Sequence, residues 1–134
     1  MKRAAAWALV LGVLVTAAPA RAHHSFAEYY IEKDTIDIEG DVVQFQYKNP
    51  HSYLFVDAPD TFGARHVYMA EWQSVSRLES DGITNKTIRP GDRVRIWGSP
   101  GRNEADHRIR LKRIKLPDGR MWGGQGGQGR QDTR

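Results

Sequence analysis

The chain has 134 residues, with 20 Lys and Arg, 16 Asp and Glu, and no cysteine. The lack of cysteine excludes disulfide scaffolds and thiol nucleophiles, and the length suits one domain with its own core. The formal net charge of +4 points toward nucleic acid only if the whole chain is retained, which the first residues argue against.

Residues 1–22 have the composition of a cleavable export signal. Met1-Lys2-Arg3 is a positive start, 4–18 are almost wholly apolar, and Ala20-Arg21-Ala22 forms a small-x-small cleavage site. The apolar run is shorter than the roughly 20 residues of a membrane helix, and no second run follows. We expect cleavage after Ala22 and a periplasmic or secreted protein without a membrane span. Three basic residues leave with the signal, so the remaining chain is nearly neutral and is not expected to bind nucleic acid.

The remaining chain divides into three parts. An N-terminal arm is predicted over 23–34, a β-barrel domain over 35–122 and a disordered tail, rich in Gly, Gln and Arg, over 123–134. Three aromatic residues are expected to dock the arm on the barrel: Phe26, Tyr29 and Tyr30.

A long first strand is predicted over 35–47. Apolar residues occupy alternate positions up to Val42, and Val43 then starts a second alternating apolar set. Such a shift indicates a β-bulge, and Gly40 is expected to permit the bend.

Four more strands and a helix follow. Strands are predicted over 52–57, 65–72, 93–98 and 108–116. A short helix is predicted over 74–81, with Gly82 after its end. A second shift of the alternation, between Leu111 and Ile114, indicates another bulge.

This order predicts the fold class. Three strands, a short helix and two strands form an all-β, five-stranded OB-like Greek-key barrel. Bulges in the first and last strands suit the closure of so small a barrel. A monomer is expected.

The chain contains a set of short motifs in this order: Ala22–Phe26, Gly40-Asp41-Val42, Asn49-Pro50-His51, Trp72, Pro90–Val94, Gly98-Ser99-Pro100 and Leu116–Arg120. In this combination the chain resembles a family of small exported bacterial proteins of unknown function. The resemblance implies an exported single domain and brings no activity.

Two histidines next to the cleavage site suggest a metal site. Cleavage after Ala22 gives His23 a free amine, which can chelate one ion together with its imidazole, with His24 alongside. Nitrogen donors favour Cu(II) among the divalent ions. Cleavage after Ala20 would instead put His23 third, where a square-planar Cu(II) or Ni(II) site forms. His51, in the first loop, is the expected additional ligand. A solvated terminus and an ordinary turn histidine are the alternative interpretation.

The other candidate ligands are interpreted as structural. His66 and His107 are expected on the surface, and Met69 in the core. Only Met69 and Met121 remain after signal removal, so a methionine-rich Cu(I) site is not expected.

A second hypothesis concerns basic residues on the last two strands, namely Arg93, Arg95, Arg108, Arg110 and Lys112. With Trp97 they would form a cationic, aromatic surface of the kind that OB folds present to polyanions. Export favours an anionic protein, a lipid headgroup or another polyanion of the cell envelope as the partner. A solvated face balanced by acidic residues is the alternative interpretation.

The sequence contains no nucleophile motif, phosphate-binding loop or carboxylate pair at catalytic spacing. Glu71 and Asp57 could contribute to an acid–base site, but outward strand carboxylates are ordinarily exposed. We therefore expect a binding protein and no enzymatic activity.

Overall fold

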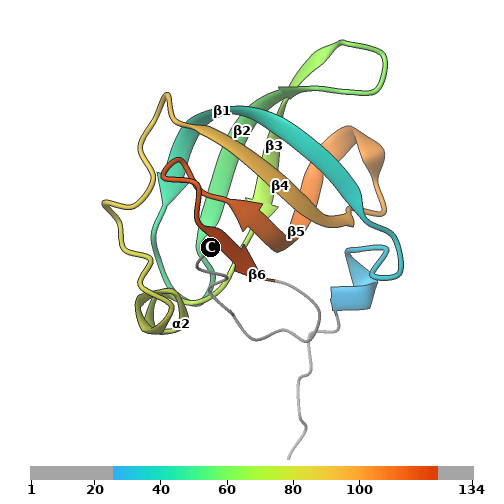
Figure 1. Cartoon of the computed structure of the whole chain (residues 1–134). Coiled ribbons are helices and arrows are strands. Elements are labelled where there is room, and N and C mark those ends of the chain that lie inside the picture. The colour runs from blue at the N-terminus through green and yellow to red at the C-terminus, as the bar shows by residue number, and fades with distance from the viewer. Residues whose placement is uncertain (1–25, 124–134) are drawn as a thin grey trace, which may run out of the picture.

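The computed structural model describes residues 26–123 (Figure 1). The predicted signal over 1–22 and residues 124–134 of the predicted tail lie outside this range. Within residues 26–123, none of the helices has the length and apolar character needed to cross a bilayer. The elements in chain order are η1 (Phe26–Glu28), β1 (Ile36–Gln46), β2 (Tyr53–Pro59), β3 (Arg65–Glu71), α2 (Val75–Ser80), β4 (Arg93–Pro100), η2 (Glu104–Asp106), β5 (Arg108–Lys115) and β6 (Met121–Gly123), where η denotes a 3-10 helix.

The strands close into a five-stranded barrel. Antiparallel pairing runs in the order β3-β2-β1-β4-β5, and a parallel pairing of β3 with β5 completes the circuit. This confirms the predicted OB-like Greek-key barrel with one short helix. The sixth strand, β6, pairs with the second half of β5 and was not predicted. It is only three residues long, too short for an alternating pattern to show.

The bulge in β1 lies where the alternation shifts, but Val43 does not turn inward. Pairing with β2 passes from Val42↔Val56 to Gln44↔Phe55, so Val43 is the extra residue, and it is 49% exposed. The prediction that Val43 joins the buried set was wrong, because the unpaired residue of a bulge does not follow the pleat on either side.

Gly40 allows β1 and β2 to pack closely. A side chain at this position would overlap the carbonyl oxygen of Asp57 on β2. The glycine therefore lets β1 approach β2 closely just before the bulge.

The second bulge lies where the sequence placed it. Trp97 of β4 pairs with Arg113, and Gly98 pairs with Leu111, so Lys112 is the extra residue on β5. The bulge returns Ile114 to the buried face, where it is fully buried together with Ile109 earlier in the strand.

The barrel interior follows the predicted alternation. On β3, Tyr68 and Ala70 point inward, whereas Met69 is half-buried on the outer face. The interpretation of Met69 as a core residue was therefore wrong: its position on the strand, rather than its apolar character, decides which face it takes.

The helix α2 covers the lower end of the barrel in Figure 1. Its Leu78 is fully buried, and the side-chain oxygen of Asn49 accepts a hydrogen bond from the first helical N–H, that of Val75, at 3.0 Å. Trp122 of β6 packs against Trp72 with ring centres 5.2 Å apart. The helix, the first loop and β6 thus meet at one end of the core.

Candidate functional site

Glu71 joins two other side chains in a hydrogen-bonded group that we call the Glu71 cluster. Nδ1 of His51 lies 2.6 Å from Oε1 of Glu71, and the Tyr30 hydroxyl donates to Oε2 at 2.5 Å. Because an ionised carboxylate only accepts hydrogen bonds, Nδ1 of His51 is the donor. Nε2 of His51 has no hydrogen-bond partner within residues 26–123.

The position of the cluster follows from strand pairing. Glu71 ends β3 and pairs with Tyr53, the first residue of β2. His51 precedes Tyr53 by two residues, after the cis peptide bond between Asn49 and Pro50. Glu71 also pairs with Arg110 of β5, where the barrel closes. The carboxylate therefore lies between the first loop and the N-terminal arm.

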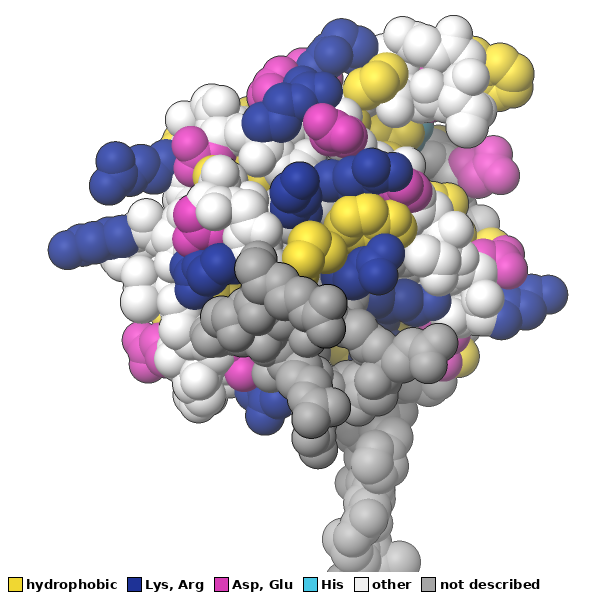
Figure 2. All heavy atoms as spheres, viewed as in Figure 1, with side chains coloured by type: hydrophobic (Ala, Val, Ile, Leu, Met, Phe, Trp, Pro, Cys, Tyr) yellow, Lys and Arg dark blue, Asp and Glu magenta, His cyan; other side chains and the backbone are white. Residues whose placement is uncertain are grey.

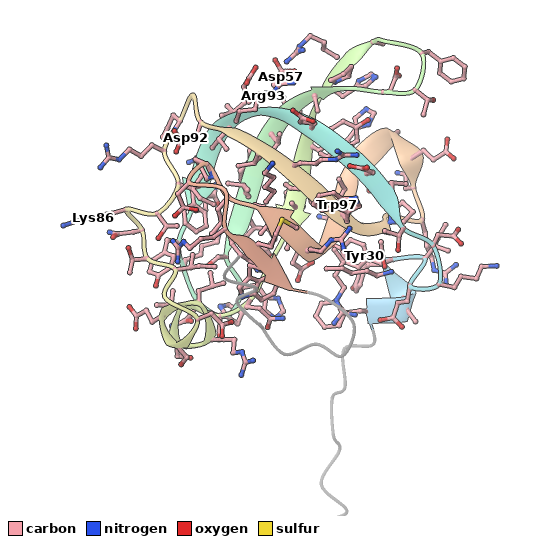
Figure 3. All side chains as sticks on the ribbon, in the orientation of Figure 1. Tyr30, Asp57, Lys86, Asp92, Arg93 and Trp97 are labelled. Carbon is pink, nitrogen blue, oxygen red and sulfur yellow. The ribbon has the colours of Figure 1, made fainter. Side chains whose placement is uncertain are left out.

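Tyr30 is the most deeply buried member of the cluster. It is 1% exposed, and its backbone forms a β-bridge with Gly101 (Figure 3). Burial, together with the hydrogen bond and negative charge of Glu71, raises the pKa of Tyr30. Its hydroxyl is therefore protonated at physiological pH and remains a donor. Of the other aromatic residues expected to dock the arm, Phe26 does so, whereas Tyr29 is 50% exposed.

Basic side chains of β5 hold the arm beside the cluster. The Arg110 guanidinium lies 3.5 Å from the centre of the Phe26 ring and forms an ion pair with Glu32 at 2.6 Å. Lys112 donates to the backbone carbonyl oxygen of Glu32 at 2.9 Å. The Phe26 ring lies 5.7 Å from the His51 ring. Two of the five residues predicted to bind an anionic partner thus contact the arm.

Two more of these residues, on β4, face the acidic half of β1. Arg93 lies 3.2 Å from Glu39 and from Asp41, and Arg95 lies 2.6 Å from Asp37. Figure 2 shows Lys and Arg side chains interspersed with Asp and Glu side chains over this face. Since β1 and β4 are antiparallel neighbours, each of these arginines has an acidic residue within reach across the strands.

The remaining member, Arg108, has no ion pair within residues 26–123, and its positive charge acts on the nearby Tyr30 hydroxyl. Trp97, labelled in Figure 3, has the guanidinium groups of Arg95 and Arg113 over its ring at 5.1 and 4.2 Å. A cationic, aromatic patch is therefore present on β4 and β5, and three of its five predicted basic residues are ion-paired.

The remaining histidines form a separate pair. The rings of His66 and His107 stack with centres 4.1 Å apart, and Nε2 of His66 lies 3.1 Å from Asp60. Both are half-buried, so the expectation that they lie on the surface is only partly met. Residues 26–123 contain no group of three or more His, Asp or Glu side chains arranged to hold a metal ion. His23 and His24 lie outside the described residues.

Sequence reasoning expected Tyr30 to dock the arm but gave it no hydrogen-bond partner, and it treated Glu71 as an exposed strand carboxylate. One signal for Glu71 was present: it ends a strand whose hairpin partner begins next to His51. Its side chain is only 14% exposed, because the arm covers it. The contact between Tyr30 and Glu71 spans 41 residues and arises from barrel closure, so no local pattern could reveal it.

One family model matches the chain, over residues 10–110, and its description is a family of unknown function, DUF6152. No curated protein and no solved structure matches the chain.

Proposed function

The chain belongs to the family of unknown function DUF6152, and we propose that it is an exported binding protein whose mature N-terminus holds a divalent metal, Cu(II) by preference, with His51 as the ligand from the barrel. One observation carries this proposal. His51 is oriented through Nδ1 by a half-buried carboxylate, and its Nε2 remains available beside the start of the arm.

The Glu71 cluster has the arrangement found behind metal-binding histidines. A histidine that binds a metal through one ring nitrogen commonly donates its other N–H to a carboxylate, which fixes the tautomer and the ring orientation. Glu71 has this role toward His51, and Tyr30 holds the second carboxylate oxygen. A turn histidine with no ligand to bind does not require two supporting side chains.

Chain connectivity puts the terminal histidines within reach. His24 precedes Phe26 by two residues and His23 by three, so their Cα atoms lie within roughly 8 and 11 Å of the Phe26 Cα. The Phe26 ring is adjacent to His51. After cleavage behind Ala22, the amine and imidazole of His23, the His24 imidazole and Nε2 of His51 would form an all-nitrogen donor set. Such a set favours Cu(II) over Ni(II) and Zn(II).

The test begins with the mature N-terminus, determined by mass spectrometry of protein recovered from the export pathway. Cu(II) is then titrated into this protein and into a form whose N-terminal amine is acetylated. We expect one tight site in the native form and at least a tenfold loss in the acetylated form, since an acetylated amine no longer binds the metal.

Variants distinguish the barrel ligand from the terminus. His51→Ala and Glu71→Gln should each weaken Cu(II) binding by about tenfold or more, the usual effect of losing a ligand or its supporting carboxylate. His66→Ala is the matched control and should bind as the native protein does. The proposal fails if no form binds Cu(II), or if acetylation of the terminal amine leaves the affinity unchanged.

The alternative function is an interaction module for an anionic protein, lipid headgroup or polyanion of the cell envelope. Its support is the Trp97 ring under two guanidinium groups, together with Arg108, which lacks an ion pair within residues 26–123. An anionic partner would have to displace the acidic side chains of β1. Reversal of Arg93, Arg95 and Arg110 to glutamate should abolish salt-sensitive binding to anionic vesicles or heparin. Absence of such binding by the native protein at low salt would exclude this alternative.

A further inference from the structure

A cavity of about 670 Å³ opens on the barrel beside the N-terminal arm. Three segments surround it: the start of β1, the β2–β3 loop and the β4–β5 loop (Figure 1). Two residues of its lining, Ile31 and Gly101, flank Tyr30, but His51, Glu71 and Tyr30 themselves do not line it. The cavity is therefore a different site from the proposed metal site.

The inner wall of the cavity is apolar and contains one unpaired hydroxyl. Ile36, Ile38 and Tyr68 line it from the barrel side. Tyr68 is 8% exposed, and its hydroxyl makes no hydrogen bond within residues 26–123. Burial, and to a lesser degree the negative charge of Asp60, raises the pKa of Tyr68, so the hydroxyl stays protonated. The hydroxyl is not itself fully buried, so it is open to a molecule that enters the cavity.

The rim of the cavity has more carboxylates than guanidinium groups. Asp37 is paired with Arg95 and Asp60 with His66, but the carboxylates of Asp34 and Glu104 have no hydrogen bond or ion pair within residues 26–123. These two are the acidic groups left for a ligand.

The two arginines on the rim also have partners outside the cavity. Nε of Arg102 donates to the carbonyl oxygen of Ala27 at 2.7 Å, and the charge of Arg108 acts on Tyr30 and Tyr53, which do not line the cavity. With four carboxylates and two guanidinium groups, the rim has a negative formal charge.

Phe62 supplies an apolar group at the entrance. It is 95% exposed at the tip of the β2–β3 loop and lines the cavity. An aromatic side chain this exposed gains favourable burial when an apolar body lies against it.

We infer that this cavity binds a small organic cation with an apolar body, such as an aromatic primary amine. The apolar body would lie against Ile36, Tyr68 and Phe62, and the ammonium group would lie at Asp34 and Glu104. The Tyr68 ring can also face the cation, an arrangement that adds attraction when water is excluded.

The probe is 2-phenylethylammonium, and its matched anion is 3-phenylpropionate, which has a similar body and the opposite charge. Each is titrated into protein with its native N-terminus while two-dimensional ¹H–¹⁵N NMR spectra are recorded. We expect saturable shifts from the cation, confined to amides of 31–38, 60–62 and 101–108, with a millimolar affinity usual for a ligand of this size. The anion should bind at least about fivefold more weakly.

Three variants test the assigned contacts. Asp34→Asn combined with Glu104→Gln should weaken binding of the cation at least about fivefold, and Tyr68→Phe should weaken it about threefold. Asp118→Asn, on the β5–β6 turn, is the matched control and should change nothing. The inference is overturned if the anion binds as well as the cation, if no saturable shift appears at these amides, or if the double variant binds the cation normally.

Discussion

The Glu71 cluster and the outer face of β1 and β4 contain polar contacts of the same length in different surroundings. His51 lies 2.6 Å from Glu71, and Arg95 lies 2.6 Å from Asp37. The Glu71 side chain is 14% exposed and that of His51 is 36% exposed, whereas Asp37 and Arg95 are 39% and 47% exposed. The two regions differ in access to water rather than in geometry.

This difference decides what each region does for the protein. Water and salt screen a charge pair on an open strand face, so such a pair adds little to stability. In the Glu71 cluster, loss of one partner leaves a polar group buried, which costs far more. The exposed pairs balance the charge of β4, while the cluster joins the arm, the first loop and β3 into one unit.

The sharpest test of this contrast removes the central carboxylate. Glu71→Ala should lower the free energy of unfolding by about 2–4 kcal/mol, because the Tyr30 hydroxyl loses its acceptor inside the protein. The matched control, Asp37→Ala, should cost under about 1 kcal/mol, since both groups of that pair are in water. Urea unfolding followed by Trp fluorescence measures both. Equal losses would mean that burial does not separate the two regions.

A smaller effect is expected when one donor is removed and the carboxylate is kept. Tyr30→Phe should lower the free energy of unfolding by about 1–2 kcal/mol, because Glu71 then retains only His51 as a partner. Tyr29→Phe, at the preceding residue, is the matched control. Because Tyr29 is 50% exposed, this substitution should leave the free energy of unfolding unchanged. The same urea unfolding experiment measures both variants. If Tyr30→Phe leaves the free energy of unfolding unchanged, the hydroxyl contributes no net stability.

A local effect is expected from Arg110. Arg110→Ala removes the contacts with Phe26 and Glu32, so the arm should open more often while the barrel is unchanged. Hydrogen exchange should speed up at the amides of Tyr30 and Ile31, which are bonded to carbonyl oxygens of the arm and of Pro100. Arg93→Ala, on the exposed face, should leave these two rates as they are. Unchanged rates in both variants would show that Arg110 does not hold the arm.

The smallest expected effect is on how stability depends on pH through the carboxyl groups of the exposed face of β1 and β4. The hydrogen bond and positive charge of Arg95 hold the pKa of Asp37 below its ordinary value. A carboxyl with a lowered folded-state pKa adds stability above its unfolded pKa of about 3.9 and loses it as the pH falls through the folded value. NMR titration of the Asp37 carboxyl should show this lowered pKa, and Arg95→Ala or 1 M NaCl should raise it toward normal. A titration unaffected by both changes would remove Arg95 as the cause.

The sequence predicted those parts of the fold that depend on residues close together in the chain. Alternation of apolar residues placed the five barrel strands and the bulge at Lys112, and helical spacing with Gly82 after the end placed the helix, since each signal depends on neighbours within a few positions. The same reasoning failed at Val43, which is the unpaired residue of its bulge, and at β6, which is too short to show a pattern.

The candidate site could be predicted from the sequence only in part. The sequence singled out His51 and the terminal histidines from residue type and position alone. Tertiary structure supplied Glu71 and Tyr30 as the partners that orient His51, and it placed Arg110 and Lys112 against the arm. These contacts join segments 20 to 80 residues apart. They form only when the barrel closes. They are therefore determined by strand register and burial, which cannot be deduced from any short stretch of the sequence.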